Sequence, residues 1–373
     1  MKSKTILSIA MAASLAAGIA VYPAVSNVLT RTGLTAGAAE SGTTNDGWKY
    51  TVVDGSYCEI TGATAIVQGD VAFPAAILLP DGVTTLPVKS VNNNFYYSGA
   101  DITGLTIPAS ITILPKQFCE LKKNLKTVTF EGSLITLPNS AFLKCTSLES
   151  IKMPSGLTTI GGSAFQNCTR LASIQIPDTV STIESYAFAG CEALKSVTVP
   201  GSVTELPEGM FRDCTALEKI TLEEGIKIVN SAVFQGCTSL TEVTFPKSVT
   251  SLSNSLVFNG CSNLESLTIL NPECKLDNLS GKEEKPLIIY GYEGSTAEEY
   301  CKEAYHHCEF KTLGEKPVKP DVPDTGEFCD ADGDGQITSA DAQYVLVYSV
   351  EDMLGNNPSW YALTKNPKAP DAN

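Results

Sequence analysis

The chain has few residues of the kinds that most enzymes and nucleic-acid-binding proteins use. Of its 373 residues only 2 are histidine and 2 are tryptophan, and charged residues make up 18%. Acidic residues outnumber basic residues by 41 to 26, which gives a formal net charge of −15. Because a phosphate backbone binds to a basic surface, this composition argues against a nucleic-acid partner.

Familiar catalytic motifs are also missing. The sequence contains no H-E-x-x-H, no G-x-S-x-G and no glycine-rich phosphate loop. His306 and His307 are adjacent to each other, and no nucleophile or carboxylate partner is evident for them in the sequence. Neighbouring carboxylates such as Glu223 and Glu224 are typical of solvated turns, not of the separated acid pair of a glycosidase. We therefore expect no catalytic residues and no enzymatic activity.

A long apolar stretch occurs only at the N-terminus. Two lysines open the chain, and no further charge follows until Arg31. Small residues offer cleavage points around Ala24 or within 36–39, so we expect residues 1–38 to be a signal peptide of a secreted protein. An uncleaved membrane anchor is the alternative. After cleavage no stable membrane span is expected.

What the chain does have is an internal repeat. A phenylalanine is followed three residues later by a cysteine six times, at Phe142/Cys145, Phe165/Cys168, Phe188/Cys191, Phe211/Cys214, Phe234/Cys237 and Phe258/Cys261. The cysteines are 23 residues apart, with one step of 24. A leucine stands three residues after each cysteine, and two apolar residues in alternation come next, often followed by proline. Self-similarity at such a period indicates a solenoid.

The alternation inside each repeat predicts the local structure. Pairs such as Ile174 and Ile176 form a short strand with two side chains turned inward, and the proline that follows ends the strand. Residues such as Val180 and Ile183 form a second extended piece, and Ala-Phe opens a turn whose ring fills the interior. One unit cannot bury its own apolar side, so the units stack. Further strands are expected at Leu105–Ile107, Val128–Phe130, Leu267–Ile269 and Leu287–Ile289, which makes about nine rungs.

These repeats resemble a known family. The segments LESIKMPSGLTTIGGSAFQNC and SVTVPGSVTELPEGMFRDC are similar to the short leucine-rich repeat of the BspA-like, or treponemal-type, bacterial surface proteins. The segment GWKYTVVDGSYCEITG resembles the start of that family's domain, and YGYEGSTAEEYCKEAYHHCEFKTLG resembles its closing strand–helix–strand cap. The resemblance implies that residues 39–313 form a right-handed solenoid with caps and a concave parallel sheet. It implies adhesion or surface binding and no catalysis.

The cysteines allow two interpretations. An even number, 12, in an exported protein suggests disulfides. A cysteine at one phase of every rung is more simply a small buried apolar residue in a ladder, and this is the interpretation we favour. Six cysteines lie off that column and have no assigned pairing, namely Cys58, Cys119, Cys274, Cys301, Cys308 and Cys329.

The outward position of each first strand defines a possible working face. Rung by rung it holds Thr106, Thr129, Lys152, Gln175, Thr198, Thr221, Thr244 and Thr268. A sugar-binding platform would present Trp or Tyr rings, and a peptide clamp would present Arg or Tyr anchors. Because threonine is also a good strand residue, we interpret the column mainly as structural. A weak, broad partner would more readily use the variable loops.

The C-terminal part changes character. Residues 314–328 are rich in proline and charge, which predicts an exposed, semi-rigid linker. The loop CDADGDGQITSADA that follows places oxygen ligands at the spacing that wraps calcium, with a glycine at its sixth position. The expected ligands are Asp330, Asp332, Asp334, Gln336, Thr338 and Asp341. A single helix follows the loop, so residues 329–373 are predicted to form a small α-helical calcium-loop module.

A calcium loop and helix after a proline-rich linker resemble a dockerin of the cellulosome type. Asp371–Asn373 would begin a second loop, so the second repeat is truncated. The resemblance implies a cohesin module of a scaffoldin as partner. The contact positions map to Ser339, Ala340, Leu346 and Val347, where the family often has Ser-Thr and Lys-Arg. The more apolar residues here imply a different cohesin specificity.

Together these patterns predict a secreted, non-catalytic component of a polysaccharide-degrading complex or of the cell surface. Its solenoid would serve adhesion or the recognition of an unknown surface or polysaccharide-associated ligand. Two alternatives remain at this point. One is a polysaccharide-degrading enzyme subunit of such a complex, and the other is a free surface adhesin with a structural calcium loop.

Overall fold

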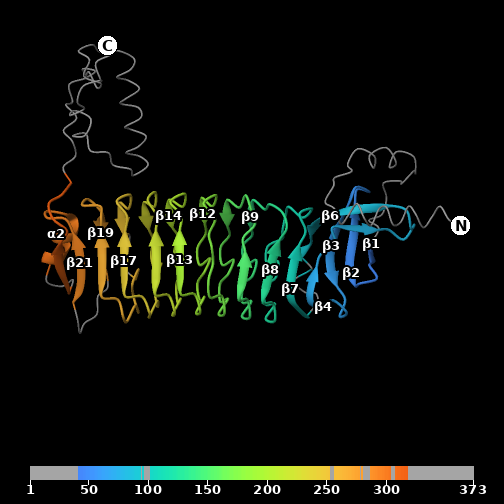
Figure 1. Cartoon of the computed structure of the whole chain (residues 1–373), viewed down its shortest axis with the longest axis horizontal. Coiled ribbons are helices and arrows are strands. Elements are labelled where there is room, and N and C mark those ends of the chain that lie inside the picture. The colour runs from blue at the N-terminus through green and yellow to red at the C-terminus, as the bar shows by residue number, and fades with distance from the viewer. Residues whose placement is uncertain are drawn as a thin grey trace, which may run out of the picture.

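The described residues form one elongated β-solenoid of about nine turns, in which the strands run across the long axis and the rungs stack along it (Figure 1). The computed structural model describes residues 41–93, 95, 101–252, 256–277, 279, 286–303 and 307–317. The predicted solenoid is thereby confirmed. The predicted signal peptide 1–38, most of the linker 314–328 and the calcium module 329–373 lie outside the described residues.

The N-terminal cap is a five-stranded sheet with the order β1-β2-β3-β6-β5. Its strands are β1 (Ser41–Thr43), β2 (Trp48–Val53), β3 (Tyr57–Ala63), β5 (Ala76–Leu78) and β6 (Thr85–Val91). β3 and β6 pair in parallel, whereas β1–β2, β2–β3 and β5–β6 are antiparallel. Trp48 and Phe73 are buried with ring centroids 4.9 Å apart, and they close this end of the core.

The first long side of the solenoid is built from parallel strands. In spatial order they are β4 (Gln68–Ala72), β7 (Asp101–Ile107), β8 (Thr127–Phe130), β10 (Ser150–Lys152), β13 (Ser196–Val199), β15 (Lys219–Leu222), β17 (Glu242–Phe245), β19 (Ser266–Ile269), β21 (Leu287–Gly291) and β22 (Cys308–Thr312). In β13 Val197 and Val199 are buried and Thr198 is exposed, so the predicted alternation is confirmed.

One predicted strand is not formed. Ile174 and Ile176 are buried and Gln175 between them is exposed, as the alternation requires. Their segment nevertheless has only an isolated parallel bridge, from Ser173 to Ser196, in place of a hydrogen-bonded ladder. The burial of Ile174 and Ile176 therefore keeps this rung in register with its neighbours, although the backbone ladder is missing.

The second long side consists of two-residue strands. These are β9 (Thr136–Leu137), β11 (Thr159–Ile160), β12 (Thr182–Ile183), β14 (Glu205–Leu206), β16 (Ile228–Val229), β18 (Ser251–Leu252) and β20 (Lys275–Leu276). They pair in parallel in two groups, β9–β11–β12 and β14–β16–β18–β20. In each strand the second residue turns into the core, which confirms the second extended piece of the repeat.

The third side is a column of turns that holds the phenylalanines. Phe165 N donates to Ala187 O of the next rung at 2.8 Å, and equivalent bonds recur along the array. Each turn needs two left-handed residues, such as Ser163 (φ 55°) and Asn167 (φ 58°). Because glycine adopts this conformation at low cost, Gly190 (φ 71°) stands in the column of Asn167.

The rings of these turns make a continuous aromatic ladder. Phe165 and Phe188 stack with centroids 5.4 Å apart and an interplanar angle of 3°, and Phe188 and Phe211 are 5.7 Å apart. The sequence pattern of the ladder changes near its N-terminal end. Cys119 N donates to Ala141 O just as Phe142 N donates to Ala164 O, so Cys119 occupies the phenylalanine position of its rung.

The C-terminal cap is β21, the helix α2 (Thr296–Lys302) and β22, as the repeat family implies. Ser295 caps the helix by accepting a hydrogen bond from Glu298 N. The hydroxyl of Tyr300 accepts a hydrogen bond from Leu279 N at 2.7 Å, which fixes the helix on the core. β22 pairs with β21 in parallel and forms the last rung of the described residues.

Candidate functional site

The outer face of the first long side is rich in hydroxyl groups. The register of β13 and β15 places Thr198 beside Thr221, and that of β17 and β19 places Thr244 beside Thr268. The first three of these side chains are exposed and Thr268 is half-buried. The predicted outward column is therefore confirmed. An extended sheet face of this kind can contact a macromolecule along several rungs.

The same column ends in residues that the sequence did not bring into alignment. Thr268 pairs with Tyr290 of β21, and Tyr290 pairs with Lys311 of β22. Tyr290 is half-buried and Lys311 is exposed. The step from Thr268 to Tyr290 is one residue shorter than the repeat, which hides this continuation in the sequence. The C-terminal end of the face thus carries an aromatic ring, which the column lacks between Thr106 and Thr268. It also carries a cation, of which that part of the column has only Lys152.

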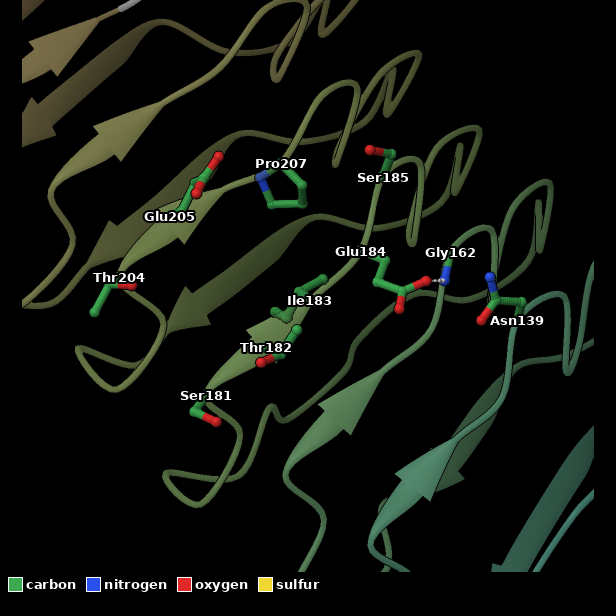
Figure 2. Close-up of a pocket in the computed structure, with 10 residues that line it drawn as sticks. All are labelled: Asn139, Gly162, Ser181, Thr182, Ile183, Glu184, Ser185, Thr204, Glu205 and Pro207. Carbon is green, nitrogen blue, oxygen red and sulfur yellow. Dashed lines mark hydrogen bonds between the residues drawn. The ribbon is translucent and has the colours of Figure 1, made fainter.

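A second candidate surface lies on the second long side of the solenoid. It is an open depression of about 580 Å³ along β12 and β14, shown in Figure 2. The lining residues are Asn139, Gly162, Ser181, Thr182, Ile183, Glu184, Ser185, Thr204, Glu205 and Pro207. Sequence analysis missed it. The signal that could have found it is the outward column of the short strands, which changes from threonine at Thr182 to Glu205.

The depression offers hydrogen-bond acceptors and hydroxyls. Glu184 points toward the neighbouring rung, where its Oε2 accepts a hydrogen bond from Gly162 N at 2.9 Å (Figure 2). Glu205 Oε1 accepts one from Asn230 Nδ2 at 2.6 Å. Among the described residues that line the depression there is no histidine, cysteine or lysine. Both carboxylates thus have partners in the protein, which suits a structural role or a weak polar contact.

The cysteine ladder is structural. Cys191 Sγ donates to Phe165 O at 3.3 Å, and Cys214 Sγ donates to Phe188 O at 3.2 Å. Burial raises the pKa of the Cys145 and Cys261 thiols to about 12. A thiol of this kind stays protonated and unreactive at neutral pH. All the described cysteines are free thiols, so the interpretation as a ladder of small buried residues is confirmed.

The predicted calcium and partner residues lie outside the described residues. This applies to Asp330, Asp332, Asp334, Gln336, Thr338, Asp341, Ser339, Ala340, Leu346 and Val347. Within the described part of the chain, no group of three or more His, Cys, Asp or Glu could hold a metal ion. Of the two histidines, His306 lies outside the described residues and His307 precedes β22. The expected absence of catalysis stays a prediction.

Parallel short strands at a fixed rung spacing, closed by caps at both ends, define a leucine-rich-repeat solenoid. Comparison with known families refines this class. The BspA-type leucine-rich repeat region matches residues 89–218 and 158–279 with 6 copies, which together span more than half of the chain. The protein belongs to the BspA-type leucine-rich repeat family. No curated protein matches the chain.

Several solved structures are similar to this chain. A leucine-rich repeat protein from Bacteroides ovatus is 22% identical, covers 74% of this chain and 79% of its own, and superposes with a TM-score of 0.53, which shows the fold. A leucine-rich repeat protein of T. pallidum is 27% identical over 53% of this chain and 90% of its own, with a TM-score of 0.46. A leucine-rich cell surface protein from Faecalibacterium prausnitzii is 16% identical over 76% and 97%, with a TM-score of 0.34.

The architecture favours binding over chemistry. Solenoids act through extended surfaces that many rungs build together. In the part of the chain that the structure describes, no helix has the length and apolar character needed to cross a membrane. A protein–protein contact or adhesion made along the array is therefore the activity that this fold supports.

Proposed function

We propose that the protein is an exported, non-catalytic binding protein whose solenoid contacts a protein partner through the outer face of the first long side. The observation that carries this proposal is the column of outward side chains from Thr106 to Lys311, whose strands pair in three separate parallel sheets. Its middle has no aromatic ring for stacking on a sugar, which favours a protein over a polysaccharide. Tyr290 and Lys311 supply the kind of anchor that a protein interface uses.

Substitutions on the face test this proposal. Thr198→Arg together with Thr221→Arg places two long charged side chains on neighbouring exposed positions, and we expect adhesion to weaken by about tenfold or more because the contact is lost. Binding of the full chain to surfaces coated with collagen, as a protein probe, or with cellulose, as a polysaccharide probe, measures the effect.

The matched control carries the same charge change on the second long side. Thr182→Arg with Thr204→Arg lies on exposed positions that line the depression. Unchanged adhesion of this control supports the proposed face. If the control loses adhesion and the first pair keeps it, the depression is the binding surface and the proposal is wrong. Binding to cellulose alone would favour the polysaccharide-associated ligand.

We further propose that the C-terminal module 329–373 binds calcium and attaches the protein to a cohesin of a scaffoldin. Support for this comes from the sequence: carboxylates occupy loop positions one, three, five and twelve, and Gly335 permits the sharp turn. The solenoid would then be displayed at the end of a proline-rich spacer. A surface adhesin whose loop only stabilises the tail is the second candidate.

Removal of one carboxylate tests the calcium loop. We expect Asp334→Ala to lower calcium affinity by at least about 100-fold, since the loss of a supporting partner of a ligand alone costs 10- to 100-fold. Isothermal titration of the chelator-treated full chain with calcium chloride measures this. Ser339→Ala is the matched control, because it changes a predicted cohesin contact and no ligand. Equal calcium affinity of Asp334→Ala and the unmodified chain would contradict the loop assignment.

The cohesin partner is tested with the same proteins. We expect binding of the full chain to immobilised cohesin modules in calcium and not in chelator. Asp334→Ala should abolish this binding, and Ser339→Ala should alter its affinity with calcium binding intact. Calcium binding without affinity for any cohesin would favour the adhesin with a structural loop.

A further inference from the structure

Two cysteines outside the repeat column meet in the C-terminal cap. Cys301 lies in the last turn of α2, and Cys308 is the first residue of β22. The thiol of Cys301 donates a hydrogen bond to the sulfur of Cys308. Both side chains are half-buried and pack against the hydrophobic core.

The two elements that carry this pair are anchored separately. Tyr300 and the Ser295 cap fix α2, while β22 is held by its parallel ladder with β21, in which Cys308 stands opposite Leu287. The contact between the sulfurs is therefore made at the junction of two positioned elements. No rearrangement of α2 or β22 is needed to bring the two sulfurs into contact.

The pair differs from the ladder cysteines in every respect that governs reactivity. Each ladder thiol is fully buried or nearly so and donates to a backbone carbonyl of the previous rung, at 2.9–3.3 Å. In the cap one thiol donates to another sulfur, and both are partly accessible. The hydrogen bond from Cys301 lowers the pKa of Cys308, and the same bond raises the pKa of Cys301. A stabilised thiolate beside a protonated thiol is the arrangement that reacts by exchange.

We propose that Cys301 and Cys308 are a redox-active dithiol whose disulfide joins α2 to β22 and closes the C-terminal end of the core. The oxidant is a disulfide of a small thiol or of an oxidised dithiol protein. The Cys308 thiolate attacks one sulfur of that disulfide, which forms a mixed disulfide and releases one thiolate. Cys301 then loses its proton, its thiolate attacks the Cys308 sulfur, and the second thiolate leaves.

The exchange is balanced. The cap loses two electrons and the two thiol protons, and the oxidant ends as two thiols. This chemistry goes beyond the binding function proposed above and requires neither the solenoid partner nor the cohesin. Its structural effect falls on β22, which among the described residues pairs with β21 alone. A rung with one paired neighbour opens more readily than the middle of a repeat array.

The test uses the full chain equilibrated with oxidised or reduced glutathione, then acid-quenched, denatured, alkylated and mapped by mass spectrometry. We expect oxidised glutathione to leave Cys301 and Cys308 unalkylated and linked, while the ladder cysteines of the same sample remain alkylatable. Two alkylated cap cysteines, or a cap cysteine linked to a different residue, overturns the proposal.

A single substitution separates the attacking role of Cys308 from the resolving role of Cys301. In Cys301→Ala the attack by Cys308 can still occur but no resolving thiol follows, so we expect Cys308 to keep one bound glutathione. Cys274→Ala, which removes a buried thiol elsewhere in the C-terminal region, should leave the cap disulfide intact. An unmodified Cys308 in Cys301→Ala under the same conditions overturns the assigned order of attack.

A structural readout checks the consequence of the bond. We expect oxidation to slow proteolytic cleavage after β22 and within the cap by about tenfold or more, because the disulfide restrains the opened state. Cys301→Ala should show no such difference between oxidising and reducing buffer. Equal cleavage rates of the oxidised and reduced unmodified chain overturn the proposed closure of the core.

Discussion

Raising the pH from about 8 to about 10 is expected to lower the free energy of unfolding of the solenoid, by on the order of 1 kcal/mol for each buried ladder thiol. The reason is that burial raises the pKa of the ladder thiols above the ordinary value of 9.0, to about 12 for Cys145 and Cys261. The pKa values of Cys168, Cys191, Cys214 and Cys237 are also raised well above 9.0 by burial. In the unfolded chain all six thiols titrate near pH 9.

The direction follows from proton counting. A folded-state pKa above the unfolded-state pKa means that the contribution to stability is complete below about pH 9 and is lost as the pH rises toward about 12. One pH unit above its ordinary pKa, each buried thiol contributes on the order of 1 kcal/mol to this loss. Urea unfolding at a series of pH values, in the presence of a reducing agent, measures it.

Substitutions in the ladder check the origin of the effect. Cys191→Ala removes one of the protons released on unfolding, so the slope of the unfolding free energy above pH 9 should become shallower by on the order of 1 kcal/mol per pH unit. Thr198→Ala, on the exposed face, should leave the slope as it is. A free energy of unfolding that is equal at pH 8 and pH 10 would show that the ladder thiols do not control alkaline stability.

The second large effect is expected from Phe188→Ala, which should lower the free energy of unfolding by about 3–5 kcal/mol and the melting temperature by about 10 °C. Phe188 is 0% exposed and stacks between Phe165 at 5.4 Å and Phe211 at 5.7 Å. Its removal leaves a cavity between two rungs and breaks two ring contacts. Because each rung contacts only its neighbours, the interface lost here cannot be replaced from elsewhere in the array.

Urea and thermal unfolding followed by circular dichroism measure this loss. Phe130→Ala is the matched control, since Phe130 ends β8 and is only half-buried. It should cost clearly less than Phe188→Ala. Comparable losses for the two variants would show that the stacked ladder adds nothing beyond the general burial of an aromatic side chain.

The fold was largely predictable from the sequence because each feature of the repeat recurs in several rungs. The spacing of Phe188 and Cys191 recurs in six rungs, and the alternation around Thr198 recurs in eight, so the inward and outward faces could be assigned from the sequence. Physical necessity completes the argument: a rung that exposes one apolar side must stack on another.

The errors and omissions occur where the repeat is irregular. Cys119 takes the backbone position that phenylalanine holds in the following rungs, and Tyr290 joins the outward column through a shortened step. The strand expected at Ile174–Ile176 keeps its side-chain burial but not its ladder. Pairing in a sheet is set by backbone contacts between rungs, which a pattern of apolar residues within one rung does not specify.

The sequence by itself determined the repeat, its aromatic and cysteine ladders and the outward threonine column, because side-chain burial in a stacked rung follows from local alternation. It also supplies the pattern on which the proposed calcium module rests. Only the tertiary structure decided what lies side by side across different rungs: the depression beside Glu184 and Glu205, and the contact between Cys301 and Cys308. Proximity of that kind depends on how the helix α2 and the strand β22 return to the end of the core, and no local spacing encodes it.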